Sequence, residues 1–378
     1  MKQKSWIWPL VLFCITLITT TLAGAESVTG RFFLYSEDGF VWDRFVQGFQ
    51  YSVPFLAILT AHEFGHYFFA KHYKASVTLP YYIPFWLGQP PFSIGTMGAF
   101  IRINSALRSR KEYFDVGIAG PLAGFVVAMG VIAYGFTHLP PPEYIFTIHP
   151  EYAQFGLNYA DVVYKNMPEG NIVMGDNLIF WFFRTYIADP TRMPNQFELM
   201  HYPLLSAGYI ALFFTAMNLI PIGQLDGGHI LYGLIGHELH KKVASVIFVL
   251  FIFYAGLDLP YMIWNAYAED SWTRWISFGA YLGYLIMVFD KIFERNLART
   301  VSLALAVFIL QVLFLDFFPK AEGYTGWLVF GLLISKMIGI GHPPAPDNRV
   351  LDTKRKVLGW LTLLIFLLCF SPKPFIVM

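Results

Sequence analysis

Charged residues are scarce in this chain of 378 residues: Asp, Glu, Lys and Arg make up 13% of it, and hydrophobic residues 56%. Soluble globular proteins carry roughly 25% charged residues. A chain this poor in charge cannot cover a water-exposed surface, which argues against an ordinary soluble protein and predicts a membrane protein. The formal net charge is +1, so the chain has no electrostatic signature of nucleic-acid binding, and we expect no nucleic-acid partner.

Cysteine is scarce as well. The chain has 2 cysteines, Cys14 and Cys369, each in an apolar run near one end of the sequence. This excludes a disulfide framework and argues against a metal site built from thiolates. The sequence also shows no repeat with a period of about 20–50 residues and no Gly/Ser-rich or Pro-rich linker. We therefore interpret the chain as one membrane domain.

Long apolar runs are abundant instead. A membrane-crossing helix needs roughly 17–25 mostly apolar residues. The sequence predicts about eight or nine such helices, at 5–23, 49–69, 114–136, 202–222, 243–256, 275–289, 301–315, 326–340 and 357–370. The first run also fits a cleaved secretory signal, because Lys2 and Lys4 precede it and small residues follow it; we favour a retained span. The expected fold class is an all-α polytopic membrane protein.

Basic residues set the expected orientation, because cytoplasmic loops carry an excess of Lys and Arg. Lys2 and Lys4 place the N-terminus inside, and the basic loop at 71–111 returns to the same side. The longest loop then lies outside. We accordingly divide the chain into an N-terminal span with an outer loop (1–48), a core with an outer loop at 138–201 (49–236), and C-terminal spans of unknown role (237–378).

The second predicted span carries His62, Glu63 and His66 within an apolar run. Residues four apart lie on one helix face, about 5–6 Å apart at their roots, so the two imidazoles can bind one zinc ion. Glu63 can reach a water molecule on that ion and take its proton, which is metalloprotease chemistry. Ionisable residues are costly inside a membrane, so we interpret this cluster as functional rather than as two structural histidines.

A catalytic zinc ion needs a third protein ligand and one open position. The best candidate is Asp226, at the inner end of the fourth predicted span. Pro221 before it would break the helix and release backbone groups that can line a polar cavity. From spacing alone, an ordinary Asp-Gly turn accounts for Asp226 about equally well. His229 is the other possible ligand in this segment.

Both segments resemble the site-2 protease family of intramembrane zinc metalloproteases. That family pairs His-Glu-x-x-His in one span with Asn-x-x-Pro-x-x-x-Leu-Asp-Gly in a later one. The chain matches these patterns at His62, Glu63 and His66, and at Asn218, Pro221, Leu225, Asp226 and Gly227. Residues 117–124 are similar to the glycine-rich start of the family's core helix, and residues 98–102 to its substrate-binding edge strand. The first span and residues 79–85 resemble the bacterial and plastid branch without a PDZ domain.

The resemblance, which covers residues 49–236, implies a role for each matching residue. The Zn2+ ligands would be His62, His66 and Asp226. Glu63 would be the general base and then the proton donor, and Asn218 would donate a hydrogen bond to the oxyanion or the substrate backbone. A short membrane-associated β-hairpin would bind substrate through Gly98, Ala99, Phe100 and Ile101.

Three of these implied features have a plainer interpretation. Asn218 could instead bond the backbone near the proline break, and the strand could belong to an ordinary hairpin beside the membrane. For residues 117–124 we favour close helix packing by small residues over contact with substrate.

We therefore expect an intramembrane zinc metalloendopeptidase that cleaves transmembrane segments of membrane-protein substrates, as in regulated intramembrane proteolysis. We place it in the lipid bilayer of a bacterial cytoplasmic membrane, with its active site toward the cytoplasm. The alternatives are a catalytically silent membrane chaperone or scaffold, and a metal-ion transporter. A transporter would spread ionisable residues along a path through several spans, whereas here they collect at one depth.

Two other histidine groups need an interpretation. His237 and His240 lie in a polar inner loop with the wrong spacing for a zinc-protease helix, so we interpret them as a solvated cluster. His201, just before the fourth predicted span, we interpret as an interfacial residue.

Overall fold

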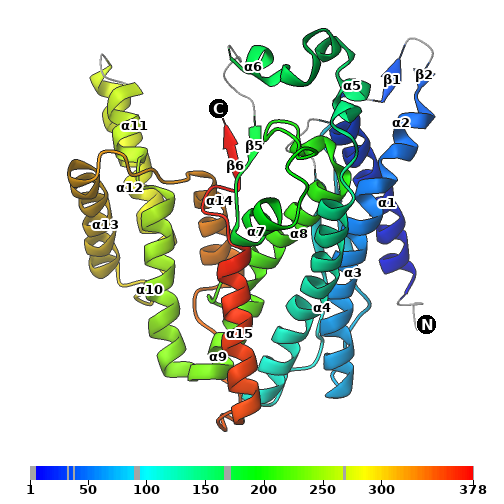
Figure 1. Cartoon of the computed structure of the whole chain (residues 1–378). Helices are drawn as coiled ribbons and strands as arrows, with labels where there is room; N and C mark the ends of the chain where they lie inside the picture. Colours follow the sequence, from blue (N-terminus) through cyan, green and yellow to red (C-terminus); the bar gives the residue numbers. More distant parts are fainter. Residues whose placement is uncertain are drawn as a thin grey trace. The chain divides into compact units, whose positions relative to one another are not determined.

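The computed structural model is mostly helical (Figure 1) and describes residues 6–31, 34–36, 39–88, 94–165, 172–266 and 270–377. Lys2 and Lys4, which support the expected orientation, lie outside the described residues. The chain forms two compact units. The first comprises Met1–Leu107, Asp115–Leu219 and Trp360–Met378, and the second comprises Arg108–Phe114 and Ile220–Gly359. The division predicted from the sequence, at residues 48 and 236, stays a prediction.

The first unit is built on long helices: α1 (Ile7–Thr29), α3 (Phe49–His72), α4 (Arg110–Thr137) from residue 115 onward, α8 (Pro203–Leu219), and α15 (Thr353–Cys369) from residue 360 onward. Helices α1 and α3 approach closely at Gly48, where an added Cβ would lie 2.0 Å from the Thr21 carbonyl oxygen. The hydroxyls of Thr21 and Ser52 form a buried hydrogen bond 2.8 Å long across the same contact. Small and hydroxyl side chains therefore join α1 to the helix that carries the first metal motif.

The core of the first unit lies where α3, α4 and α8 meet. Its fully buried side chains include Phe55 of α3, Ile132 and Phe136 of α4, and Tyr209 and Leu212 of α8. At Gly208 an added Cβ would lie 2.5 Å from Ile132, so α4 and α8 are in direct contact there. This packing fixes the helices that carry the metal motif and Asn218.

Short helices connect the long helices of the first unit. They are α2 (Trp42–Gln47), η1 (Pro142–Tyr144), α5 (Ile145–Ile148), η2 (Pro150–Asn158), α6 (Ala160–Val163), α7 (Leu178–Tyr186) and η3 (Leu199–His201). Strands β1 (Tyr35–Ser36) and β2 (Gly39–Phe40) pair with each other, and β5 (Ile172–Met174) pairs with β6 (Phe375–Val377). The Tyr209 hydroxyl donates to the Pro374 carbonyl at 2.7 Å, which ties the end of the chain to α8.

The expected β-hairpin is present. Strand β3 (Tyr81–Phe85) pairs antiparallel with β4 (Gly95–Phe100), which contains Gly98, Ala99 and Phe100. The prediction that Ile101 belongs to the strand is wrong, because β4 ends at Phe100. Continued in register, Ile101 would face Pro80, which has no backbone N–H to donate. Within the part of the chain that the structure describes, β4 pairs only with β3.

The second unit contains α9 (Asp226–Ile235), α10 (His237–Ala255), α11 (Leu259–Ala266), α12 (Ser271–Phe289), α13 (Leu297–Phe317), α14 (Gly326–Leu333) and the π-helical turn η4 (Ile334–Ile338). Gln311 of α13 is fully buried. Its amide donates to the Phe253 carbonyl at 3.0 Å and accepts from the Tyr281 hydroxyl at 3.0 Å. Helices α10, α12 and α13 are thus joined by buried hydrogen bonds.

Several helices can cross a membrane by length and composition. Among the described residues there are four: Ile7–Thr29, Arg110–Thr137, His237–Ala266 and Leu297–Phe317. They coincide with four of the predicted spans. Helices Pro203–Leu219 and Gly326–Ile338 are apolar but shorter. Helix α3 covers the predicted run at 49–69 but is not one of the four.

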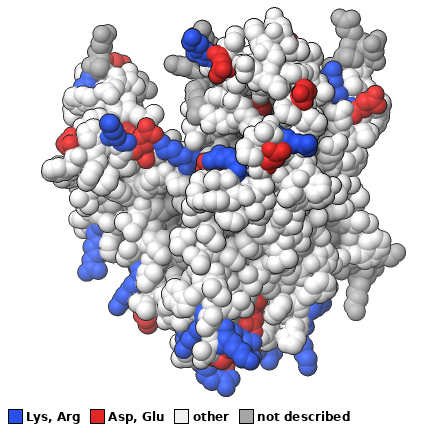
Figure 2. Space-filling model, viewed as in Figure 1, with Lys and Arg blue, Asp and Glu red and all other residues white. Residues whose placement is uncertain are grey.

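Apolar side chains face outward on these helices, as expected beside lipid. On α13, Ile309 and Leu310 are 53% and 54% exposed. On the face seen in Figure 2, long stretches of the helices carry no Lys, Arg, Asp or Glu. Such a surface suits hydrocarbon rather than water.

Candidate metal centre

Helix α3 brings His62, Glu63 and His66 together. The Nε2 atoms of the two histidines are 3.1 Å apart, and their ring centroids are separated by 4.8 Å. All three side chains are buried, with exposures of 6% for His62, 4% for Glu63 and 8% for His66. The helix therefore directs two imidazole nitrogens to one buried point, with a carboxylate beside them.

A backbone carbonyl decides which nitrogen of His66 carries the proton. His66 Nδ1 lies 2.7 Å from the Val116 carbonyl oxygen of α4. A carbonyl only accepts, so Nδ1 is the protonated nitrogen and Nε2 of the neutral ring has a lone pair directed at His62. Metal-binding histidines are commonly held in this way by a hydrogen bond at the second nitrogen. The arrangement fits a zinc ion, which takes imidazole nitrogens at about 2.0–2.1 Å.

Glycines of α4 make room for the two histidines. A Cβ added at Gly120 would lie 2.1 Å from His66 Nε2, and one added at Gly124 would lie 3.0 Å from the His62 Cβ. At Gly65 of α3, an added Cβ would lie 2.5 Å from the Ala119 carbonyl oxygen. The interpretation of residues 117–124 as a close-packing segment is confirmed, and what it packs against is the metal motif.

Asn218 faces the same histidine pair. It lies in the last turn of α8, and its amide Nδ2 is 3.4 Å from His62 Nε2. The side chain is thus directed at the metal motif, and its role toward the oxyanion or the substrate backbone stays a prediction. The amide is a hydrogen-bond donor beside the position that a metal or its bound oxygen would occupy.

Asp226 is the first residue of α9, in the second unit. Helix α8 ends at Leu219, as the proline at 221 predicts, and residues 220–225 connect the two helices. Gly223 in this connection has φ +61° and donates its N–H to the Ile340 carbonyl at 2.9 Å. The loop before Asp226 is therefore held by the segment at 338–340.

His229, the other candidate ligand, is engaged within the second unit. Its Nδ1 lies 2.7 Å from His342 Nε2, and the His342 ring stacks on Tyr232 at a centroid distance of 4.0 Å. Burial, together with His229, lowers the pKa of His342 to about 3. His342 is therefore uncharged at neutral pH.

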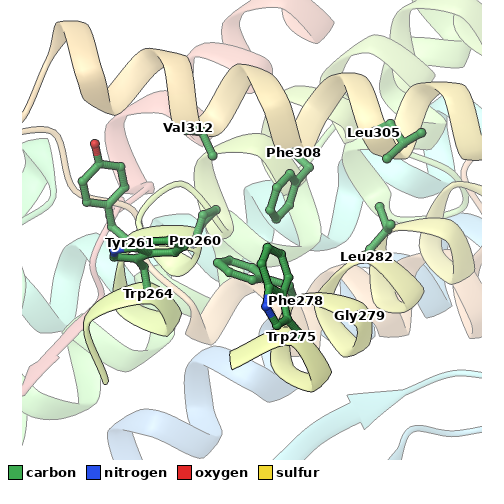
Figure 3. A pocket seen from close by; sticks show the side chains of 10 residues that line it. All are labelled: Pro260, Tyr261, Trp264, Trp275, Phe278, Gly279, Leu282, Leu305, Phe308 and Val312. Atoms are coloured by element: carbon green, nitrogen blue, oxygen red, sulfur yellow. The ribbon is translucent and has the colours of Figure 1, made fainter. Parts of the chain in front are cut away.

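Three outcomes were not visible in the sequence. The Val116 carbonyl that orients His66 is a backbone group, so no residue type could signal it. His240, expected to be solvated, is fully buried instead, 6.2 Å from the Tyr232 ring centroid. An apolar cavity of about 670 Å³ between α11, α12 and α13 (Figure 3) is lined by none of the predicted site residues.

Comparison with known proteins agrees with the motif. Residues 50–257 match Peptidase family M50. The probable chloroplastic zinc metalloprotease EGY1 of Oryza sativa subsp. japonica is 29% identical over 189 residues, which are 48% of this chain and 27% of that protein. The probable chloroplastic zinc metalloprotease EGY2 of Oryza sativa subsp. indica is 27% identical over 196 residues, 50% of this chain and 30% of that protein.

EGY1 of Arabidopsis thaliana, another probable chloroplastic zinc metalloprotease, is 28% identical over 181 residues, 48% of this chain and 28% of that protein. The matches thus span less than a third of the length of these relatives. No solved structure matches the chain. The family match covers more than half of the chain and contains the histidine motif, the glycine segment and Asn218. The chain therefore belongs to Peptidase family M50, the site-2 protease family of zinc metalloproteases.

Proposed function

We propose that this chain is a zinc endopeptidase that cleaves peptide bonds within membrane-spanning segments of other membrane proteins. The observation that carries the proposal is the histidine pair of α3, whose Nε2 atoms are 3.1 Å apart and buried in an apolar helix. Glu63 adjoins the pair, and an ionisable group buried in this setting is expected to be functional. Burial of the site in apolar helices points to a substrate that is itself in the membrane.

Asp226 is the third zinc ligand in this proposal. It completes the Asn-x-x-Pro-x-x-x-Leu-Asp-Gly pattern that begins at Asn218. Asn218 contacts His62, and residues 219–226 span at most about 29 Å even when fully extended. The carboxylate is thus tethered within reach of the histidine pair. Two imidazoles and one carboxylate form a known catalytic zinc set that leaves a fourth position open.

Glu63 acts on protons in this mechanism. A zinc ion bound by this set would polarise the scissile carbonyl and lower the pKa of a bound water toward about 7. Glu63 takes a proton from the attacking water and then gives it to the departing amine. Asn218 donates its amide N–H toward the oxygen on which negative charge develops.

In this proposal, strand β4 binds the unwound segment of the substrate. A helix hides its scissile carbonyl in hydrogen bonds to residues four positions away, so the segment must unwind before it can be cut. The freed backbone groups need new partners inside a membrane. Gly98, Ala99 and Phe100 lie on a strand that pairs on one side only in the described part of the chain. An added Cβ at Gly98 would lie 3.9 Å from Phe214, one turn before Asn218 on α8.

The full topology is part of the proposal. We infer about eight or nine spans, because apolar helices also cover the runs at 202–222, 275–289, 326–340 and 357–370. The basic loops then place the metal site toward the cytoplasmic side of a bacterial membrane.

The deciding experiment compares membranes that contain the wild-type protein with membranes that contain Glu63→Gln. The variant should keep its zinc, because Glu63 is not a ligand, and should lose activity by about 10²-fold to 10⁴-fold. Membrane proteins that are cut in wild-type membranes should accumulate uncut. Glu238→Gln, which changes an exposed carboxylate on α10, is the matched control and should behave as wild type.

Two results would contradict the protease function. If no membrane protein accumulates uncut while the biological effect persists in Glu63→Gln, the chain is a scaffold. If reconstituted vesicles show zinc flux without cleavage of any trapped candidate, it is a transporter.

A further inference from the structure

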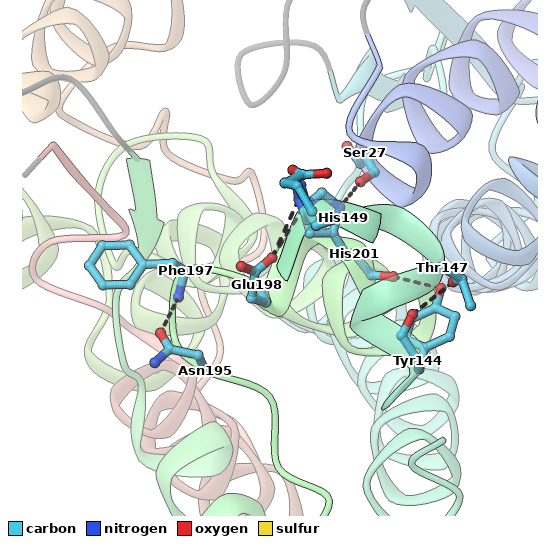
Figure 4. A network of polar contacts seen from close by, with 9 residues as sticks. Ser27, Tyr144, Thr147, His149, Asn195, Phe197, Glu198 and His201 are labelled. Carbon is cyan, nitrogen blue, oxygen red and sulfur yellow. Dashed lines mark hydrogen bonds and ion pairs between the residues drawn. The ribbon is translucent and has the colours of Figure 1, made fainter. Parts of the chain in front are cut away.

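A second cluster of residues that could hold a metal ion lies in the first unit (Figure 4). It belongs to the segment between α4 and α8, which is called the outer segment below. It consists of His149, between α5 and η2, together with Glu198, which precedes the short helix η3, and His201, the last residue of η3. The sequence analysis interpreted His201 as an interfacial residue. The structure buries it to 5% exposure and Glu198 to 3%, with His149 against both.

The spacing of the three donor atoms matches a tetrahedral zinc ion. His149 Nε2 and His201 Nε2 are 3.4 Å apart, and Glu198 Oε2 lies 3.4 Å from His201 Nε2 and 3.8 Å from His149 Nε2. Ligands of a tetrahedral zinc ion at bond lengths of about 2.0–2.2 Å are separated by about 3.3–3.6 Å. The separations of the three atoms, two of which come from one short segment and the third from residue 149, are thus already close to the edge lengths of a coordination tetrahedron.

Hydrogen bonds at the other ring nitrogens direct both lone pairs into the cluster. His201 Nδ1 donates to the Ser27 carbonyl at 2.5 Å, and His149 Nδ1 donates to the Glu151 carboxylate at 3.1 Å. When neutral, each ring therefore carries its hydrogen on Nδ1 and has an acceptor lone pair at Nε2. Two lone pairs and a carboxylate oxygen facing one another repel unless a metal ion or a shared proton lies between them.

The three residues are also held in place from outside the cluster. The His149 ring stacks on Tyr152 with a centroid distance of 4.5 Å. The Tyr144 hydroxyl donates to the His201 carbonyl at 3.1 Å. Glu198 ends a turn in which its N–H donates to the Asn195 carbonyl at 2.9 Å. Preorganised ligands with such supports are typical of metal sites.

We propose that His149, Glu198 and His201 form a second zinc site, with water at the fourth position. Access for that water is on the His149 side, where the side chain is 25% exposed. Because His201 is bonded to Ser27 at the end of α1 and precedes α8, the ion joins α1, the outer segment and α8. Binding of this ion does not depend on the proposed protease function.

Zinc content of the purified full chain in detergent tests the proposal. After equilibration with buffered zinc, the wild type should hold two equivalents by mass spectrometry. His149→Ala and Glu198→Gln should each hold one. His138→Ala, which changes an exposed histidine of the same outer segment, is the matched control and should hold two. His66→Ala removes a ligand of the first site only, so it should hold one.

Cobalt binding and thermal unfolding provide further readouts. The His66→Ala protein should bind one Co2+ and show the visible absorption of tetrahedral cobalt, which adding His149→Ala abolishes. Zinc at 100 times its Kd should stabilise the outer segment of the wild type by about 2.7 kcal/mol. His66→Ala that binds no metal, or His149→Ala that keeps wild-type zinc content, would show that a shared proton occupies the cluster and would overturn the proposal.

Discussion

At the scale of single residues, the metal motif depends on neighbouring groups that are not themselves metal ligands. His66 is oriented by the Val116 carbonyl and seated against Gly120. A methyl group at residue 120 would occupy the space that His66 Nε2 needs, with a separation of 2.1 Å. The spacing of the two histidines on α3 positions the ligands. Helix α4 provides the space for the His66 ring and the carbonyl group that sets its tautomer.

Gly120→Ala should therefore destroy the site although alanine is the better helix former. We expect zinc affinity to fall by at least about 10–100-fold, because the His66 ring must move. The thermal midpoint should fall too, since overpacking costs typically about 1–3 kcal/mol. Gly130→Ala on the same helix meets nothing within 4 Å and serves as the control. Equal zinc content in the two variants would show that His66 can bind metal from another position.

At the scale of elements, a glycine contact between two loops holds the start of α9. Gly223 has φ +61°, and an added Cβ would lie 1.8 Å from the Gly339 carbonyl oxygen. The two segments are joined by the hydrogen bond from Gly223 N–H to the Ile340 carbonyl and by another from the Gln224 amide to the Ile338 carbonyl at 3.2 Å. The segment after α14 thus has a definite role, which is to fix the loop that ends at Asp226.

Gly223→Ala should displace this loop and with it the proposed third ligand. We expect zinc affinity at the first site to fall by about 10–100-fold, as when a support of a ligand is lost. The measurement is zinc competition against a chelator in the purified protein. Gly341→Ala, with nothing within 4 Å of the added Cβ, should bind zinc as the wild type does. Unchanged affinity in Gly223→Ala would argue that Asp226 is not a ligand.

At the scale of the whole molecule, the sequence could predict helices better than membrane crossings. Each predicted apolar run coincides with a helix, yet among the described residues four helices are long and apolar enough to count as spans by themselves. Helix α3 carries His62, Glu63 and His66, which lower its apolar character. A polar active site thus weakens the hydropathy signal of the very helix that positions it.

Substrate cleavage should depend on how easily the substrate's own helix unwinds. Glycine costs about 1 kcal/mol relative to alanine in a helix, so an Ala→Gly change near the cut should raise the rate about fivefold. The measurement uses a substrate trapped with Glu63→Gln, reconstituted with the wild-type enzyme in liposomes. The same change placed far from the cut is the control. A rate that does not respond to glycine near the cut would contradict entry of an unwound segment along β4.

The sequence by itself determined the chemistry: two imidazoles one helical turn apart, a carboxylate beside them, and an apolar setting. These follow from local spacing, which a helix converts directly into geometry. The tertiary structure decided the tautomer of His66 and the space for its ring beside Gly120. It also decided the direction of the Asn218 side chain and the end of β4 at Phe100.

The tertiary structure also decided that His149, Glu198 and His201 come together. The i, i+3 spacing of Glu198 and His201 was the only local signal of this cluster. These features depend on contacts between residues far apart in the chain and on backbone carbonyls, and neither leaves a pattern in the order of residue types.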